Sequence, residues 1–231
     1  EIPFDSAIAQ KLGEKYGIDV SGKNIIMVTG RPVKRKGFSW FLKNVMPLLY
    51  NDVILILTGP LKKSQTFFDI FLRCLPKMLR HKIQLLFGFP DDNKEVIEQL
   101  KKQKNAFHLG RVSNEDLMQI ISLADLFVMP NINIPGDVEG FGLVALEASA
   151  RGTYVLASKV QGITDAVIDM ENGTLLPCEN AEAWADKIKE MLSDKEKLKI
   201  LSEKGRNFTI QHFSWQKMVD EYKQVFDGFI H

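Results

Sequence analysis

The chain has 231 residues, of which 45% are hydrophobic and 26% charged, and its formal net charge is +1. This composition is typical of a globular domain with a sizeable core, and the nearly balanced charge gives no argument for a nucleic-acid partner. No apolar run reaches the roughly 20 residues that span a bilayer, and nothing resembles a secretory leader. Cys74 and Cys178 lack metal-site spacing, which predicts buried, reduced thiols in a cytoplasmic protein.

Short apolar runs rich in branched residues alternate with helical patterns along the chain. The runs predict strands buried on both faces, at Asn24–Thr29, Val53–Leu57, Ile83–Phe87, Leu126–Met129 and Thr153–Ala157. The alternation predicts an α/β fold built on a Rossmann-like, doubly wound parallel sheet. Ligands of such sheets bind outside the carboxyl ends of the strands. The loops after Thr29, after a short strand ending near Phe107, and after Met129 are therefore the candidates for a site.

The helical patterns have recognisable starts and faces. Ser113 with Asp116 is typical of a capping box at the start of a helix. Two helices close the chain, and the last, within residues 211–231, has a strong apolar stripe over Trp215–Phe229 that is interpreted as a packing surface. The stretch Leu61–His81 is interpreted as an inserted helix with no assigned role.

A basic loop, Gly30-Arg-Pro-Val-Lys-Arg-Lys36-Gly37, follows the first predicted strand. The fork of donors on arginine and the compact charge of lysine suit a diphosphate group. A solvated basic turn is the alternative, and the loop by itself does not decide between the two. It is not a phosphate-binding loop of the Walker type, because the pattern GxxxxGK[ST] is absent.

Two carboxylates flank a glycine-rich turn in Glu139-Gly-Phe-Gly-Leu-Val-Ala-Leu-Glu147. Glycines let a ligand approach the backbone, and the N-terminus of the following helix attracts anions. The carboxylates can accept hydrogen bonds from sugar or ribose hydroxyls. A phosphate site and a polyol site on one element predict a nucleotide sugar as ligand.

Two further motifs are weaker. Gly140, Gly142 and Ala145 satisfy the dinucleotide pattern G-x-G-x-x-A, but about ten residues separate them from the preceding strand, which disfavours a nicotinamide dehydrogenase. In the segment His108–Val112, the arginine at 111 would either flank a base or pair with a surface acid. The histidine is interpreted as structural.

These residues together resemble the C-terminal, donor-binding half of group-1 retaining glycosyltransferases with the GT-B fold. The resemblance covers nearly the whole chain after residue 24, and the glutamate pair beside Gly-Phe-Gly, joined to the Arg…Lys-Gly loop, is its specific signature. The matching segments are Gly30–Gly37, Gly110–Leu117, Ala124–Pro130, Glu139–Glu147, Gly152, Gly162, Asn172–Gly173 and Leu175–Pro177. Gln161–Gly162 and Thr164–Asp165 depart from the family's Gly-Gly and Pro-Glu.

The resemblance implies a role for each matching residue. Arg31 and Lys36 would hold the donor diphosphate and stabilise the departing nucleotide, and Glu139 would contact hydroxyls of the transferred sugar; these three are the expected catalytic residues. The expected donor-binding residues are Gly30, Arg111, Val112, Phe141, Gly142, Leu143 and Glu147. Among them, Glu147 would accept from the ribose hydroxyls and Val112 would line the base. No metal or other cofactor is implied, and Asp91-Asp92 is interpreted as opening the helix that follows.

The same resemblance implies the organisation and the activity. Residues 1–23 would be a linker from a missing N-terminal acceptor-binding domain, residues 24–210 the nucleotide-sugar-binding domain, and residues 211–231 a C-terminal amphipathic helix that is partly exposed without the other domain. The implied enzyme is cytoplasmic and moves a hexosyl group from a nucleotide-diphosphate sugar to a glycan, lipid or small molecule. Its full length leaves room for peripheral membrane association, and this domain alone would be inactive.

The alternative is a non-catalytic nucleotide-sugar-binding module that acts with a partner chain. A sugar-nucleotide epimerase or a phosphorylase of the same fold is a weaker alternative, because neither is expected to combine the glutamate pair with the Arg…Lys-Gly loop. The sequence does not specify the base, the sugar, the acceptor or the oligomeric state.

Overall fold

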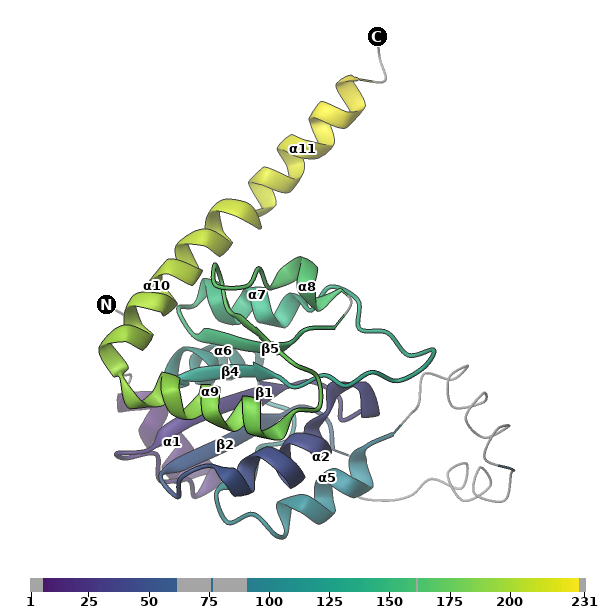
Figure 1. Cartoon of the computed structure of the whole chain (residues 1–231). Coiled ribbons are helices and arrows are strands. Elements are labelled where there is room, and N and C mark those ends of the chain that lie inside the picture. Colours follow the sequence, from purple (N-terminus) through teal and green to yellow (C-terminus); the bar gives the residue numbers. More distant parts are fainter. Residues whose placement is uncertain (1–5, 62–75, 77–90, 161, 229–231) are drawn as a thin grey trace.

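A parallel sheet forms the centre of the molecule (Figure 1). The computed structural model describes residues 6–61, 76, 91–160 and 162–228. Within them, six strands lie in the order β3-β2-β1-β4-β5-β6. Their bounds are β1 (Asn24–Thr29), β2 (Val53–Thr58), β3 (Ala106–His108), β4 (Leu126–Met129), β5 (Tyr154–Ser158) and β6 (Thr174–Leu176). The winding direction reverses between β1 and β4, as in Rossmann-like sheets, so the predicted fold class is confirmed.

The predicted strands agree closely with those observed. β1 and β4 have the predicted bounds, and β2 and β5 end one residue later than predicted. The short strand expected near Phe107 is β3, which ends at His108. The run Ile83–Phe87 lies outside the described residues. β6 was not predicted, because three residues are too few to give a periodic signal.

Apolar residues on opposite faces of the strands build two cores. On β1, Ile26 and Val28 belong to one core, and Ile25 and Met27 belong to the other. The elements over the first core are α2 (Phe38–Trp40), a π-helical turn η2 (Phe41–Val45), a 3-10 turn η3 (Met46–Leu48), α5 (Asn93–Leu100) and α9 (Ala181–Ser193). Those over the second are α1 (Ser6–Tyr16), α6 (Asn114–Leu123), α7 (Leu143–Ala150) and α8 (Ile163–Ala166). Both faces of the sheet are therefore covered by helices (Figure 1).

The described part of the segment 1–23, which was predicted to be a linker, contributes to the second core. Ile8 and Leu12 of α1 are buried there, followed by Ile18 and Val20. Because these side chains are buried against the sheet and its helices, the stretch from Ile8 to Val20 packs as part of this domain.

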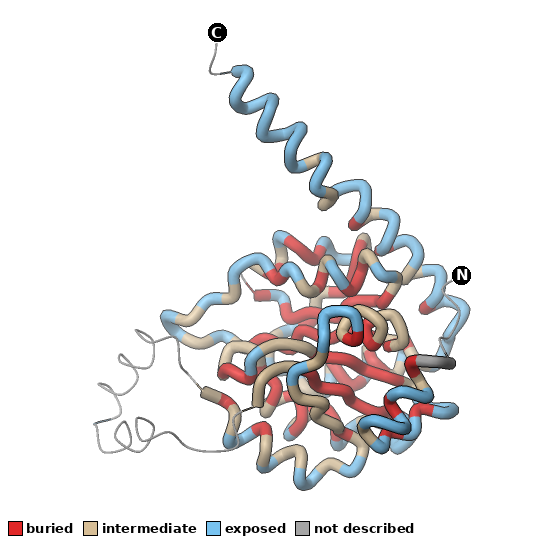
Figure 2. The backbone as a smooth tube through the Cα atoms, turned by 180° about the vertical axis from the view of Figure 1, so that it is seen from behind, coloured by how far each residue is buried: buried red, intermediate tan, exposed pale blue. Residues whose placement is uncertain are grey.

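The two C-terminal helices differ in their packing. α10 (Lys195–His212) lies against α7 and β5, whereas α11 (Trp215–Asp227) projects away from the sheet (Figure 1) and none of its residues is buried. Its apolar stripe, predicted to be partly exposed, includes Trp215 at 79% exposure, and Figure 2 shows the helix exposed along nearly all its length. In the described residues, no helix combines the length and hydrophobicity that crossing a bilayer requires.

Two predictions fall wholly or mostly outside the described residues. The insertion Leu61–His81 is described only at Leu61 and Pro76, and Cys74 is not described. Cys178 is half-buried, and its Sγ donates to the backbone oxygen of Asn131 at 3.4 Å. Burial raises the pKa of this thiol, which disfavours the reactive thiolate.

Candidate functional site

The reversal of the sheet brings two loops together at one edge. β1 and β4 are parallel neighbours, with Ile26 opposite Leu126, so the basic loop after β1 and the loop that leads to Glu139 leave the sheet side by side. Gly37 has a φ of 66°, and a Cβ there would lie 1.9 Å from the carbonyl oxygen of Pro130. Only glycine fits this close approach. A hydrogen bond of 2.9 Å from Ile132 N–H to the oxygen of Arg35 also joins the loops.

Glu139 lies where these loops meet. Its Oε2 atom is 2.9 Å from Lys36 Nζ and 3.3 Å from Arg35 Nε, and it accepts a hydrogen bond of 3.0 Å from Asn131 Nδ2. Arg35 also pairs with Asp137 at 2.9 Å. Among the described residues all three donors to Glu139 reach the same oxygen, which leaves Oε1 able to accept from a further hydroxyl.

The charges around Glu139 change its titration. Burial by itself raises the pKa of this carboxyl, but the positive charges of Lys36 and Arg35 and the hydrogen bonds from Lys36 and Asn131 outweigh it, so the pKa lies below its ordinary value. A carboxyl with a depressed pKa in the folded state stabilises the fold above the unfolded-state pKa of about 4.3. That stabilisation is lost as the pH falls through the folded-state pKa.

We therefore expect the free energy of unfolding of the wild type to fall more steeply than that of Glu139→Gln when the pH drops below about 4.3. Urea titrations at a series of pH values between neutral and acidic measure the difference. Because the two proteins differ in this one carboxyl, the difference between their pH profiles reports chiefly on Glu139. Parallel pH profiles would contradict the assignment.

The structure separates the four cations of the basic loop. Lys34 turns to Asp92 and Glu95, at 3.4 and 3.0 Å, and Arg35 is committed to Asp137 and Glu139. Lys36 lies beside the glycine-rich turn, and Arg31 is exposed. The loop is therefore not a uniformly solvated basic turn, since Lys34, Arg35 and Lys36 all pair with the protein's own carboxylates.

A hollow of about 500 Å³ opens between the two loops and the start of α7, a size within the range of small-molecule sites. Six of the predicted site residues line it, namely Gly30, Lys36, Glu139, Phe141, Gly142 and Leu143. Gly142 precedes α7 with a φ of 78°, which a glycine adopts without strain. The first-turn N–H groups of the helix thus face the same hollow as the lysine and the glutamate.

The remaining predicted residues lie around this hollow and do not line it in the described structure. Arg31 and Arg111 are exposed, and Val112 packs partly buried against the second core. Glu147 is exposed further along α7. His108, interpreted as structural, accepts a hydrogen bond of 3.0 Å at Nδ1 from the backbone N–H of Gly110.

The sequence analysis did not predict several residues of the site, among them Thr29 and Val144, which also line the hollow. Asn131 and Asp137 hold Glu139 and Arg35, and each has one buried side-chain oxygen with no hydrogen-bond partner among the described residues. Arg35 was recognised as one of the four cations of the basic loop, with no role of its own. Leu117, which lines the hollow, was interpreted as an apolar position of a helix. The polar loop from Asn131 to Val138 carried the one available signal, since polar side chains beside an apolar strand end are candidates for a site.

The glycine-rich turn is also braced from the C-terminal helices. The ring of Phe141 packs against Phe213, with ring centroids 6.1 Å apart, and Phe213 lies between α10 and α11. The side chain of Phe141 therefore leans toward the base of the projecting helix, while its backbone belongs to the hollow.

Fold and site together define a Rossmann-like domain with a basic loop, a glutamate and a helix N-terminus at the switch point, an arrangement suited to a ligand with phosphate and hydroxyl groups. The chain belongs to the group 1 glycosyl transferases, because the model of that family matches residues 14–208. It is 30% identical over 196 residues to a D-inositol 3-phosphate glycosyltransferase of Saccharomonospora viridis, covering 80% of this chain and 41% of that protein.

Two solved structures share the fold. Anabaena Alr3699/HepE, solved in complex with UDP and glucose, superposes with a TM-score of 0.73 at 21% identity, over 97% of this chain and 53% of that one. The C-terminal domain of a group 1 family protein (LpcC) from Francisella tularensis superposes with a TM-score of 0.61 at 23% identity, over 90% of this chain and 93% of that one. The chain thus spans about half or less of the longer relatives, and it matches an excised C-terminal domain nearly end to end.

Proposed function

We propose that this chain is the donor-binding half of a retaining glycosyltransferase, which transfers a hexosyl group from a nucleotide-diphosphate sugar to an acceptor. The observation that carries the proposal is the hollow at the switch point, where Lys36, Glu139 and the start of α7 face one another. Cation, carboxylate and helix N-terminus are complementary to a diphosphate joined to a sugar. The complex of Alr3699/HepE with UDP and glucose supports this choice of ligand.

In this proposal, Arg31 and Lys36 bind the diphosphate and stabilise negative charge on the departing nucleotide. Glu139 accepts from a sugar hydroxyl through the oxygen that its three protein donors leave open. The backbone N–H groups of Phe141, Gly142 and Leu143 meet the sugar and phosphate. Because fixed cations supply the charge, the reaction needs no metal ion.

Three contacts lie outside the lining of the hollow. Glu147 accepts from the ribose hydroxyls, and Arg111 and Val112 flank the base. Each lies on a segment next to the hollow: Glu147 on α7, and the other two in the loop between β3 and α6. A bound nucleotide therefore extends from the hollow toward that loop, which places its base away from the transferred sugar.

A second domain completes the proposed enzyme. The exposed apolar stripe of α11 supports contact with an acceptor-binding domain, because an uncovered amphipathic helix face is a natural packing surface. We propose that the acceptor is bound by that domain, so that this chain alone binds donor without efficient transfer. The proposed enzyme acts in the cytoplasm, where nucleotide sugars are substrates.

Calorimetric titration of this chain without metal tests the proposal, with uridine, guanosine and adenosine diphosphates and their sugar conjugates as ligands. We expect one nucleotide series to bind, and Arg31→Ala or Lys36→Ala to weaken it about 10- to 100-fold, since a charge-assisted hydrogen bond contributes about 1.5–3 kcal/mol. Lys43→Ala, which removes an exposed charge from η2, is the control and should bind like the wild type. No binding of any series at millimolar concentration would overturn the proposal.

A further inference from the structure

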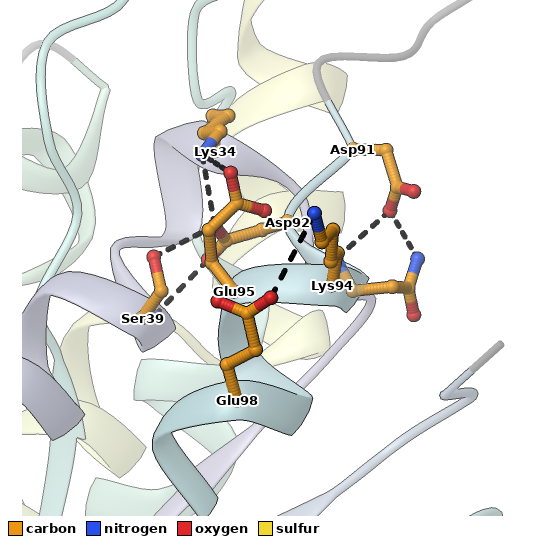
Figure 3. Close-up of polar contacts among 8 residues, drawn as sticks. Lys34, Ser39, Asp91, Asp92, Lys94, Glu95 and Glu98 are labelled. Carbon is orange, nitrogen blue, oxygen red and sulfur yellow. Dashed lines mark hydrogen bonds and ion pairs between the residues drawn. The ribbon is translucent and has the colours of Figure 1, made fainter. Parts of the chain in front are cut away.

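A carboxylate that the proposed function does not use lies fully buried beside the basic loop. Asp92 has 0% exposure and directly precedes α5, as predicted for a residue that opens a helix. Its carboxylate, however, does not cap that helix. Both of its oxygens accept hydrogen bonds from Ser39 instead (Figure 3). A buried charge requires donors to offset its lost hydration.

Those donors belong to the segment that carries the proposed diphosphate ligands. Oδ1 of Asp92 accepts from Ser39 Oγ at 2.7 Å and lies 3.4 Å from Lys34 Nζ, while Oδ2 accepts from Ser39 N–H at 3.1 Å. The backbone N–H of Asp92 donates to the oxygen of Pro32 at 3.0 Å, and Asp91 forms an antiparallel bridge with Val33. The contacts thus reach both sides of Lys36.

The contacts of Asp92 join α5 to the basic loop and to the start of α2. Burial raises the pKa of Asp92 despite the hydrogen bonds from Ser39 and the charge of Lys34, so burial disfavours its ionised form. A buried ion pair is weak evidence for stability, but it can hold one conformation against others. The carboxylate of Asp92 also accepts from the backbone N–H of Ser39 in the first turn of α2. A donor that has no partner within the helix is therefore satisfied by the protein's own carboxylate.

We propose that Asp92 and Ser39 are positioning residues for the donor diphosphate, which hold the loop of residues 31–37 in the conformation that presents Arg31 and Lys36 to the ligand. The loop is then fixed from two directions. Asp92 holds it from the side of α5, and Pro130, Ile132 and Glu139 hold it from the side of β4. The inference rests on the proposed function, because it concerns the geometry of the same binding site.

The test compares dissociation constants of this chain for the nucleoside diphosphate that binds the wild type. Asp92→Asn puts an amide donor in place of one of two acceptor oxygens, so it must lose a contact to Ser39 or Lys34. We expect about tenfold weaker binding, a typical effect of losing one charge-assisted hydrogen bond. Ser39→Ala should weaken binding similarly, and Ser39→Thr, which keeps the hydroxyl, should restore it.

Two comparisons separate positioning from a general loss of structure. Asp91→Asn is the matched control, since Asp91 accepts from Asn93 N–H and its side chain faces away from the loop (Figure 3); it should bind within twofold of the wild type. In a Lys36→Ala background, Asp92→Asn should weaken binding by a smaller factor than in the wild type, because part of its effect acts through the position of that lysine.

The outcomes distinguish this inference from the proposed function. A wild type that binds no nucleotide overturns both. A wild type that binds while Asp92→Asn and Ser39→Ala match it overturns the positioning role alone. Full additivity of Asp92→Asn with Lys36→Ala, or failure of Ser39→Thr to restore binding, also overturns that role.

Discussion

Replacing Trp184 with alanine should lower the free energy of unfolding by about 3–5 kcal/mol, the usual cost of removing a large buried aromatic side chain. Trp184 has 0% exposure in the first core. Its ring lies nearly perpendicular to the rings of Phe41 and Trp40, with centroids 5.8 and 6.3 Å away. Its Nε1–H donates to the backbone oxygen of Pro177 at 3.1 Å. The substitution therefore leaves a cavity and a backbone acceptor without its partner.

Urea denaturation of the isolated chain measures this loss. Domains are usually stable by only about 5–15 kcal/mol, so the variant should have a much lower midpoint. Trp184→Phe, which keeps a ring in the core, should lose less. Trp215→Ala removes the same side chain from exposed α11 and should change stability by less than about 0.5 kcal/mol. Equal midpoints for the two alanine variants would show that the core is not organised around Trp184.

The second large effect is expected in the kinetics of Glu139 and Glu147 variants of a polypeptide that joins this chain to an acceptor-binding domain. Glu139→Ala should lower kcat at least about 100-fold, as expected for a group that acts on the reacting sugar in the transition state. Glu147→Ala should instead raise the donor KM about tenfold with kcat nearly unchanged, the pattern of a contact made equally in ground and transition states. The reason is position: Glu139 lines the hollow beside Lys36, whereas Glu147 is exposed further along α7.

Steady-state kinetics with varied donor and saturating acceptor distinguish these effects. Glu139→Gln is the control for folding, since its amide still accepts from Arg35 or Asn131 and keeps the shape of the cluster. It should remain folded at neutral pH, with the smaller stability expected from the loss of the ionised carboxylate, and still transfer slowly. Unchanged kinetics in both alanine variants would remove the two glutamates from the proposed roles.

The sequence predicted those parts of the fold that rest on local patterns. Asn24–Thr29 and Leu126–Met129 are apolar runs buried on both faces, and both form strands with the predicted bounds. The predicted helix start is confirmed, because Ser113 Oγ accepts from Asp116 N–H at 3.0 Å, whereas the carboxylate of Asp116 pairs with Lys11 and Lys15. Such signals need only neighbouring residues, whereas β6 consists of three residues and offers too short a pattern.

The site was predicted as a set of segments, but its internal pairing was not. The basic loop and the Glu139 turn were expected at strand ends, and the structure places them around one hollow. Nothing local shows which cations turn toward the protein's own carboxylates, since Arg35 and Asp137 are 102 residues apart. The burial of Asp92 likewise depends on Ser39, which is 53 residues away. The sequence therefore predicted Asp92 as a helix start and not as a partner of the basic loop.

The distance along the chain between the two loops has a consequence for how the protein acquires its site. Lys36 and Glu139 meet only because β1 has paired with β4, with Ile26 beside Leu126, and pairings between distant segments are slow steps in folding. No fragment confined to either half of the sheet would contain the binding hollow. A ligand that recognises the hollow binds the folded chain and not the unfolded chain. The free energy of unfolding therefore increases with the concentration of that ligand.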